Sequence, residues 1–236
     1  MINDNLKPRI ILFNKPFQVL CQFSEHEGKE TLAAHIAIPD IYPAGRLDFD
    51  SEGLLILTDN GQLQSLITHP DHKLDKTYWA QLEGDISEQA IDALRSGVNL
   101  NDGTTLPATV SKISAPVVWE RHPPIRQRAN KPTSWIELTI REGKNRQVRR
   151  MTAAVGHPTL RLIRKSIGAW TLSELAPGEW TDAPLTGELA AKLASAPKKA
   201  KHKKTHVANT KYHKSNKERN AGKPQRHKQK KNPKTK

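Results

Sequence analysis

The sequence predicts an α+β protein with a central, mostly antiparallel or mixed sheet that is flanked by helices. Short apolar or alternating segments, which are typical of strands, are separated by Gly, Pro and Asn turn residues. Helical segments are interspersed among them without a regular strand–helix alternation. Because several strands follow one another through short turns, we expect hairpins rather than βαβ units to dominate.

The N-terminal part should supply strands and two short helices. Residues 10–13 predict a strand, and residues 18–23 look like its return partner beyond the polar turn at 14–16. A short helix is expected at 31–38, where a proline follows. A second helix is expected at 62–68, because Asp and Asn caps precede it and His-Pro ends it.

The C-terminal part should continue the same mixture of elements. Alternation predicts five strands, at residues 76–82, 108–113, 117–120, 134–140 and 159–167. Three helices are expected, at residues 88–96, 145–155 and 187–193. The first of these has the clearest boundaries, because Ser87 is a favoured N-cap and Gly97 a favoured residue after a helix.

Charge and composition divide the chain into a polar leader at 1–8, a folded domain at 9–196 and a basic tail at 197–236. The net charge is +14, of which the tail, with 16 Lys and Arg and one acid, contributes +15, so the rest is near −1. The tail has almost no apolar residues, so we expect it to be disordered. It is either an electrostatic arm for RNA, which we favour, or a dispensable extension.

The composition also indicates a cellular compartment. A single cysteine, Cys21, allows no internal disulfide. Neither a signal peptide nor an apolar run long enough to span a bilayer is present in the sequence. We therefore expect a cytoplasmic protein without membrane association.

Residues 45–61 form the segment around which the functional interpretation is built. An acidic turn lies between Arg46-Leu47 and the apolar run at 54–57, which is typical of a buried strand. Asp48 should thus be mounted next to a rigid element. The acidic spacing also resembles an EF-hand loop, but the flanking residues favour strands over helices, so calcium is the weaker alternative; a simple turn-closing role for Asp48 is the other.

The sequence contains few other motifs that are typical of catalytic or cofactor-binding sites. It contains no glycine-rich phosphate loop, and its ten histidines lack the spacing of zinc proteases. A reaction that uses a carboxylate, with neither a metal nor an organic cofactor, is the remaining enzymatic option. The helix expected at 145–155 is densely basic, because Arg146 and Arg150 share a face and Arg149 lies beside them.

Five separated motifs resemble the ribosomal branch of the pseudouridine synthases. They are Ile-Leu-Phe-Asn-Lys-Pro at 11–16, Gly-Arg-Leu-Asp followed by Phe-Asp-Ser-Glu-Gly-Leu-Leu at 45–55, Lys-Thr-Tyr at 76–78, Glu-Gly-Lys-Asn-Arg-Gln-Val-Arg-Arg-Met at 142–151, and Leu-Ile-Arg-Lys-Ser-Ile-Gly at 162–168. The resemblance covers roughly residues 9–183. It implies the pseudouridine synthase fold in two subdomains, and the sequence is most similar to members that lack the S4 RNA-binding domain, so we expect none.

The resemblance implies roles for three catalytic residues. Asp48 matches the aspartate that attacks the target uridine, either by forming a covalent bond or by removing a sugar proton. Tyr78 matches the tyrosine that stacks on the base and takes the proton from carbon five. Arg149 matches the arginine that pairs with the catalytic aspartate, and an ordinary surface charge is its alternative.

The resemblance also implies contacts with RNA. Arg46 matches the residue that fills the gap left by a flipped uridine, with a salt bridge to Asp50 or Glu52 as the alternative. Leu162 should pack under the base or in the core. The expected phosphate contacts are basic side chains from two elements: Arg146, Arg150, Arg161, Arg164 and Lys165.

Two functions follow as hypotheses. The leading one is an isomerase, acting as a monomer, that converts a uridine of 23S rRNA, or of a large-subunit precursor, to pseudouridine. The other is a non-catalytic rRNA-binding or assembly factor that has the same fold. Asp48→Asn separates the two, because only the enzyme needs this carboxylate.

Overall fold

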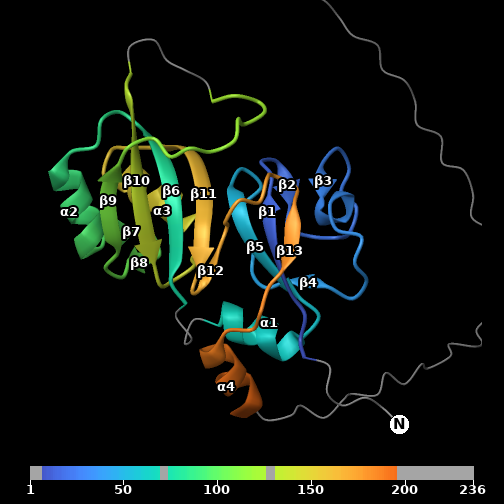
Figure 1. Ribbon diagram of the computed structural model, residues 1–236. Coiled ribbons are helices and arrows are strands. Elements are labelled where there is room, and N and C mark those ends of the chain that lie inside the picture. Colours follow the sequence, from blue (N-terminus) through green and yellow to red (C-terminus); the bar gives the residue numbers. More distant parts are fainter. Residues whose placement is uncertain (1–6, 70–73, 126–130, 196–236) are drawn as a thin grey trace, which may run out of the picture. The chain divides into compact units, whose positions relative to one another are not determined.

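A computed structural model describes residues 7–69, 74–125 and 131–195, and its largest element is a mixed sheet (Figure 1). Seven strands follow the order β13-β1-β5-β11-β6-β10-β9, while β12 pairs with β11 and β4 with β5. All neighbours are antiparallel except β5 and β11, which are parallel. The predicted α+β class is confirmed.

The elements have the following bounds. The strands of the sheet are β1 (Ile10–Lys15), β4 (Tyr42–Pro43), β5 (Glu52–Thr58), β6 (Lys76–Glu83), β9 (Thr109–Ile113), β10 (Thr133–Ile140), β11 (Thr159–Ile167), β12 (Trp170–Thr171) and β13 (Trp180–Asp182). The helices are α1 (Gly61–Thr68), α2 (Glu88–Ser96), α3 (Gln147–Ala154) and α4 (Gly187–Ser195). Two short pairs lie outside the sheet: β2 (Val19–Leu20) with β3 (Glu30–Thr31), and β7 (Asn99–Leu100) with β8 (Gly103–Thr104).

Strand β5 is buried along its whole length and joins two parts of the sheet. Its antiparallel neighbour is β1, and its parallel neighbour is β11 through the pairs Ile163 with Glu52 and Arg164 with Gly53. Gly53 has a φ of +101°, and a Cβ there would lie 2.5 Å from the carbonyl oxygen of Arg164. A glycine is therefore required for this close approach of β5 to β11.

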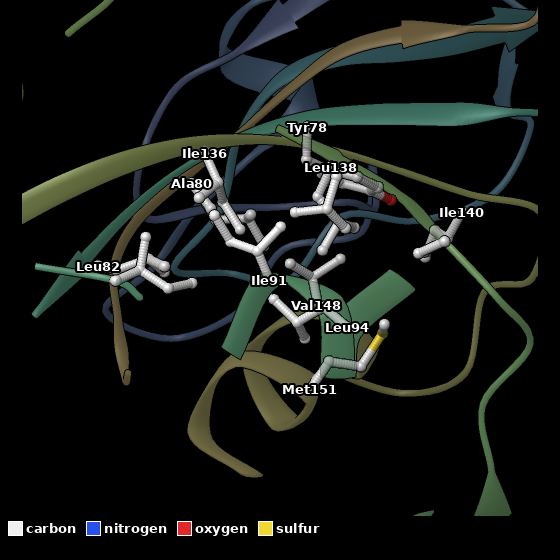
Figure 2. Packing of buried hydrophobic residues seen from close by; sticks show 14 of the residues in the cluster. Tyr78, Ala80, Leu82, Ile91, Leu94, Ile136, Leu138, Ile140, Val148 and Met151 are labelled. Carbon is white, nitrogen blue, oxygen red and sulfur yellow. The ribbon is translucent and has the colours of Figure 1, made fainter. Parts of the chain in front are cut away.

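Strand β6 carries the core of the other part of the sheet. Alternate residues Tyr78, Ala80 and Leu82 point to the face that α2 and α3 cover, where they meet side chains such as Ile91 and Met151 (Figure 2). This packing follows from the two-residue period of a strand and the apolar face of each helix.

The helix boundaries agree with their sequence signals. Helix α2 begins after Ser87, whose hydroxyl accepts a hydrogen bond from the backbone N–H of Ala90, and ends at Gly97, which has a φ of +96°. Helix α1 begins after Asn60, whose side chain accepts from Gln62 and Leu63. Both caps were predicted, although the sequence left Asp59 as an alternative to Asn60.

The helix predicted at 145–155 covers only Gln147–Ala154, so Arg146 lies just before it. Three other predicted elements differ more from the structure. Residues 18–23 do not return along β1: only Val19–Leu20 forms a strand, and it pairs in parallel with β3, since β1 is already flanked by β5 and β13. The helix at 31–38 is a 3₁₀ turn at Leu32–Ala34. Residues 117–120 form no strand; they follow Pro116, which has no backbone N–H, and β9 pairs with β10 instead.

Some expectations fall outside the described residues. The whole basic tail, residues 197–236, lies outside the described residues, which end at Ser195, and so does most of the leader, residues 1–6. Their expected properties stay predictions. Within the part of the chain that is described, no helix is long and apolar enough to cross a bilayer.

Candidate functional site

A cavity of about 960 Å³ opens beside the loop that precedes β5. Most of the predicted site residues line it: Arg46, Asp48, Tyr78, Arg146, Leu162 and Arg164. These residues come from four separate segments of the chain, so the fold has brought together what the sequence keeps apart. Four predicted site residues do not line this cavity: Arg149, Arg150, Arg161 and Lys165.

Asp48 lies in the short connection between β4 and β5, and its backbone is held from two sides. The N–H of Leu47 donates to Sγ of Cys21 at 3.2 Å, and that thiol donates back to the Leu47 carbonyl oxygen at 3.3 Å. The N–H of Ser51 donates to the Asp48 carbonyl oxygen at 3.1 Å. With Leu47 buried in the core, the loop is anchored while the Asp48 side chain stays 29% exposed to the cavity.

Arg149 of α3 and Arg146, which directly precedes this helix, are arranged differently from the expectation. Arg146 Nη1 lies 3.7 Å from a carboxylate oxygen of Asp48 but donates to Asp50 at 2.7 Å, and its Nη2 donates to the second Asp50 oxygen at 2.8 Å. Arg149 Nη2 donates to the Asp50 carbonyl oxygen at 2.6 Å, and its Nε lies 3.6 Å from the Asp50 carboxylate. The expected partner of Asp48, Arg149, is thus engaged by Asp50.

These contacts set the charge state of Asp50. Hydrogen bonds from Arg146 hold the pKa of the Asp50 carboxyl below its ordinary value, against the opposing effect of burial. The same contact raises the pKa of Arg146. Burial lowers the pKa of Arg149, whose side chain is 12% exposed, and Asp50 counteracts it. The sequence suggested Asp50 only as a partner for Arg46 or as a ligand in a calcium loop, and it did not indicate that Asp50 binds Arg146 and Arg149.

Tyr78 and Leu162 form an apolar wall of the cavity on adjacent strands. Tyr78 lies on β6 opposite Arg164 of β11, and Leu162 lies opposite Ala80, so all four share one face of the sheet. Tyr78 and Leu162 are 8% and 4% exposed and belong to the same core cluster. Leu162 therefore has both of the surroundings that the sequence suggested, the core and the cavity.

Arg164 corrects an expectation, because it is buried instead of being free for phosphate. Its Nε donates to the Leu54 carbonyl oxygen at 2.7 Å and its Nη1 to the Arg46 carbonyl oxygen at 3.2 Å. The side chain thereby holds the backbone two residues before Asp48. Its Nη2 is buried and has no hydrogen-bond partner among the described residues.

Arg161 corrects a second expectation, because it forms a buried ion pair with Glu52. Its Nε and Nη2 donate to the two Glu52 oxygens at 2.9 and 2.8 Å, and the side chains are 7% and 1% exposed. The Trp119 indole also donates to Glu52, at 2.8 Å. Since Asp50 and Glu52 are both bound by arginines and the strand β5 follows them, this segment is not an EF-hand calcium loop.

The remaining predicted RNA contacts are on the surface or on the other face of the sheet. Arg46 is exposed at the cavity, because its alternative partners Asp50 and Glu52 are bound by other arginines. Arg150 donates to Asp102 at 2.6 and 3.0 Å. Lys165 donates a hydrogen bond to Glu137 at 2.7 Å, and its ammonium lies over the ring of Trp79. Trp79 points to the face of the sheet opposite to that of Tyr78.

Sequence reasoning missed Lys15, which is fully buried. Its ammonium donates to the carbonyl oxygens of Pro16 and Val19 at 2.7 and 2.8 Å, and burial lowers its pKa to about 8. The lysine fixes the turn after β1. A second cavity, of about 1000 Å³, opens nearby between Arg149 and Arg121, whose guanidinium lies 4.2 Å from the ring centre of Phe17.

Comparisons with known sequences match most of this chain to proteins of one family. A family model described as RNA pseudouridylate synthase matches residues 9–154. A "Ribosomal large subunit pseudouridine synthase E" from Vibrio parahaemolyticus is 55% identical over 177 residues, which are 75% of this chain and 74% of the relative. The protein of the same name from Xanthomonas campestris pv. campestris is 55% identical over 174 residues, 72% of this chain and 93% of the relative.

Solved structures give the same result. A crystal structure described as that of a pseudouridylate synthase has a TM-score of 0.64 at 30% identity, covering 79% of this chain and 74% of the other. The fold of this chain therefore matches that of a solved pseudouridylate synthase. The chain belongs to the RNA pseudouridylate synthase family, whose members are isomerases.

Proposed function

We propose that this enzyme converts a specific uridine of 23S rRNA to pseudouridine, with Asp48 as the catalytic group. The observation that carries the proposal is that Asp48 and Tyr78 line one cavity, with Asp48 partly exposed to it. The names of the relatives, which are large-subunit pseudouridine synthases, support the choice of the ribosomal large subunit. The enzyme works in the cytoplasm as a monomer.

The reaction moves the uracil from one attachment to another on the same sugar. The bond from N1 to the sugar breaks, the detached base rotates, and a bond from carbon five to the sugar forms. Carbon five then loses its proton and N1 gains one, so no cofactor is consumed. Asp48 attacks the uridine, by covalent bonding or by removal of a sugar proton, while Tyr78 stacks on the base and accepts the carbon-five proton.

The uridine must leave the RNA stack before it reaches Asp48. Arg46, exposed at the cavity, fills the place that the base leaves. Leu162 supports the base from the wall of the cavity. Surface cations hold the RNA backbone by charge and shape: Arg146, Arg150 and Lys165.

Mapping pseudouridines in 23S rRNA from cells that lack the gene tests the proposal. Carbodiimide labelling followed by primer extension should show one stop missing relative to the parent strain. The wild-type gene should restore it. An unchanged pattern of stops in the deletion strain would contradict 23S rRNA as the substrate.

Replacing Tyr78 by phenylalanine should separate stacking from proton transfer. The ring remains and the hydroxyl is lost, so turnover should fall about 100-fold or more while RNA affinity stays close to wild type. The measurement is tritium release from carbon-five-labelled RNA, together with a filter-binding assay. Tyr42→Phe is the matched control, because Tyr42 is 54% exposed on β4. Wild-type turnover in Tyr78→Phe would mean that the hydroxyl takes no part.

A further inference from the structure

Asp50, which the proposed chemistry does not use, makes more contacts with the arginines of the site than Asp48 does. Both of its carboxylate oxygens accept from Arg146, at 2.7 and 2.8 Å, in the bidentate geometry that suits a guanidinium. Its carbonyl oxygen accepts from Arg149 at 2.6 Å, and its carboxylate lies 3.6 Å from Arg149 Nε. One residue thus holds both cations.

The consequence for Asp48 is a loose contact with one of these cations, Arg146. Arg146 Nη1 approaches Asp48 to 3.7 Å, beyond hydrogen-bond distance, because that guanidinium is directed at Asp50. A positive charge at this distance attracts the Asp48 carboxylate electrostatically. It leaves the Asp48 oxygens without the bidentate bond that would occupy them. An attacking carboxylate needs this combination of charge and free oxygens.

The backbone of Arg146 is a second, independent indication that this arrangement is held in place. Arg146 precedes α3 with a φ of +48° and a ψ of +34°, the left-handed region, which costs energy for a residue with a side chain. Such a conformation persists only where surrounding contacts determine it. Its bidentate bond to Asp50 and the hydrogen bond from Arg150 N–H to the Arg146 carbonyl oxygen are such contacts.

We propose that Asp50 is a positioning residue, which keeps Arg146 close to Asp48 but prevents it from pairing tightly with Asp48. The proposal rests on the proposed function of Asp48. Without the Asp50 carboxylate, Arg146 turns to the remaining carboxylate nearby and forms hydrogen bonds with Asp48. Asp48 is then occupied, and its attack on the uridine is slow.

Steady-state kinetics of Asp50→Asn test this on an RNA substrate that the wild-type enzyme modifies. We expect kcat to fall about 100-fold, the order of effect of displacing a reacting group by about 1 Å, while KM changes less than about threefold. Asp50→Glu, which keeps the charge, should recover part of kcat. Asp182→Asn removes a similar bidentate partner, that of Arg9 on the edge strand β13, and should match wild type in both constants.

A double-mutant cycle shows whether Asp50 acts through Arg146. If it does, Asp50→Asn combined with Arg146→Gln should reduce kcat little more than the more damaging single change, because the two effects are not independent. Additive losses, or an Asp50→Asn enzyme with wild-type kcat, would overturn the proposal.

A crystal structure of the Asp50→Asn protein gives a readout that does not depend on activity. We expect an Arg146 nitrogen within about 2.9 Å of an Asp48 oxygen, as in a charge-assisted hydrogen bond. An Arg146 side chain still 3.7 Å or more from Asp48 would contradict the positioning role. A wild-type enzyme that makes no pseudouridine would instead refute the proposed function, and the crystal structure would still decide how Asp50 places the arginine.

Discussion

Asp48→Asn should abolish pseudouridine formation. The amide has nearly the shape of the carboxylate but neither its charge nor its ability to attack, so turnover should fall by roughly 10⁴-fold or more, as when a nucleophile is removed from other enzymes. Single-turnover assays with excess enzyme would measure this, because they report the chemical step rather than product release.

The same variant distinguishes the enzyme from a non-catalytic RNA-binding factor. Its folding should be little changed, since the Asp48 side chain is partly exposed and its closest cation is held by Asp50. Its RNA affinity should also stay near wild type. Asp40→Asn is a suitable control, because Asp40 is exposed and has a φ of +54°, a conformation that asparagine tolerates well. Normal turnover in Asp48→Asn would show that Asp48 is not the catalytic group, whereas RNA binding without any turnover by the wild-type protein would favour the binding-factor hypothesis.

Arg161→Ala should cause the largest loss of stability among changes near the site. It leaves the Glu52 carboxylate, which is 1% exposed, without its bidentate partner. Removing one member of a buried ion pair costs about 3–5 kcal/mol, because the remaining charge is no longer compensated. The measurement is urea-induced unfolding, followed by circular dichroism at constant pH.

Two further variants separate the buried charge from other effects of the change. Arg9→Ala breaks the exposed pair with Asp182 and should leave the free energy of unfolding nearly unchanged. The double change Arg161→Met with Glu52→Gln removes both charges and keeps an acceptor for Trp119, so it should recover most of the lost stability. A loss below about 1 kcal/mol in Arg161→Ala would show that Glu52 is not effectively buried.

Much of the fold follows from local signals in the sequence. Helix α2 was predicted to the residue, because Ser87 and Gly97 mark its ends by chemistry that needs no tertiary contact. Strand β11 was also predicted at its observed bounds. Residues 18–23 were assigned wrongly because strand partners are chosen by contacts distant in sequence, and β1 has better partners in β5 and β13.

The site residues that belong to sequence motifs could be predicted, but the roles of residues that depend on burial could not. The structure places Asp48, Tyr78 and Arg46 around one cavity. Arg161 and Arg164 look like surface cations in the sequence, since a pattern of alternation does not reveal that both faces of β11 are covered. The contacts of Asp50 with Arg146 and Arg149 join two segments about 100 residues apart in the sequence. A single sequence does not reveal such a contact.

The parallel pairing of β5 with β11 determines which molecule must change its conformation when the substrate enters, the protein or the RNA. Asp48 is carried by the loop before β5, and Tyr78 by β6, and β11 is bonded to both of these strands. Their separation is therefore set by backbone ladders and by the close packing at Gly53. Spreading the two residues apart would break those ladders, so the protein is a rigid template. In the proposed reaction the RNA must deform to fit it, and the cost of extruding the uridine, a few kcal/mol, falls on the nucleic acid.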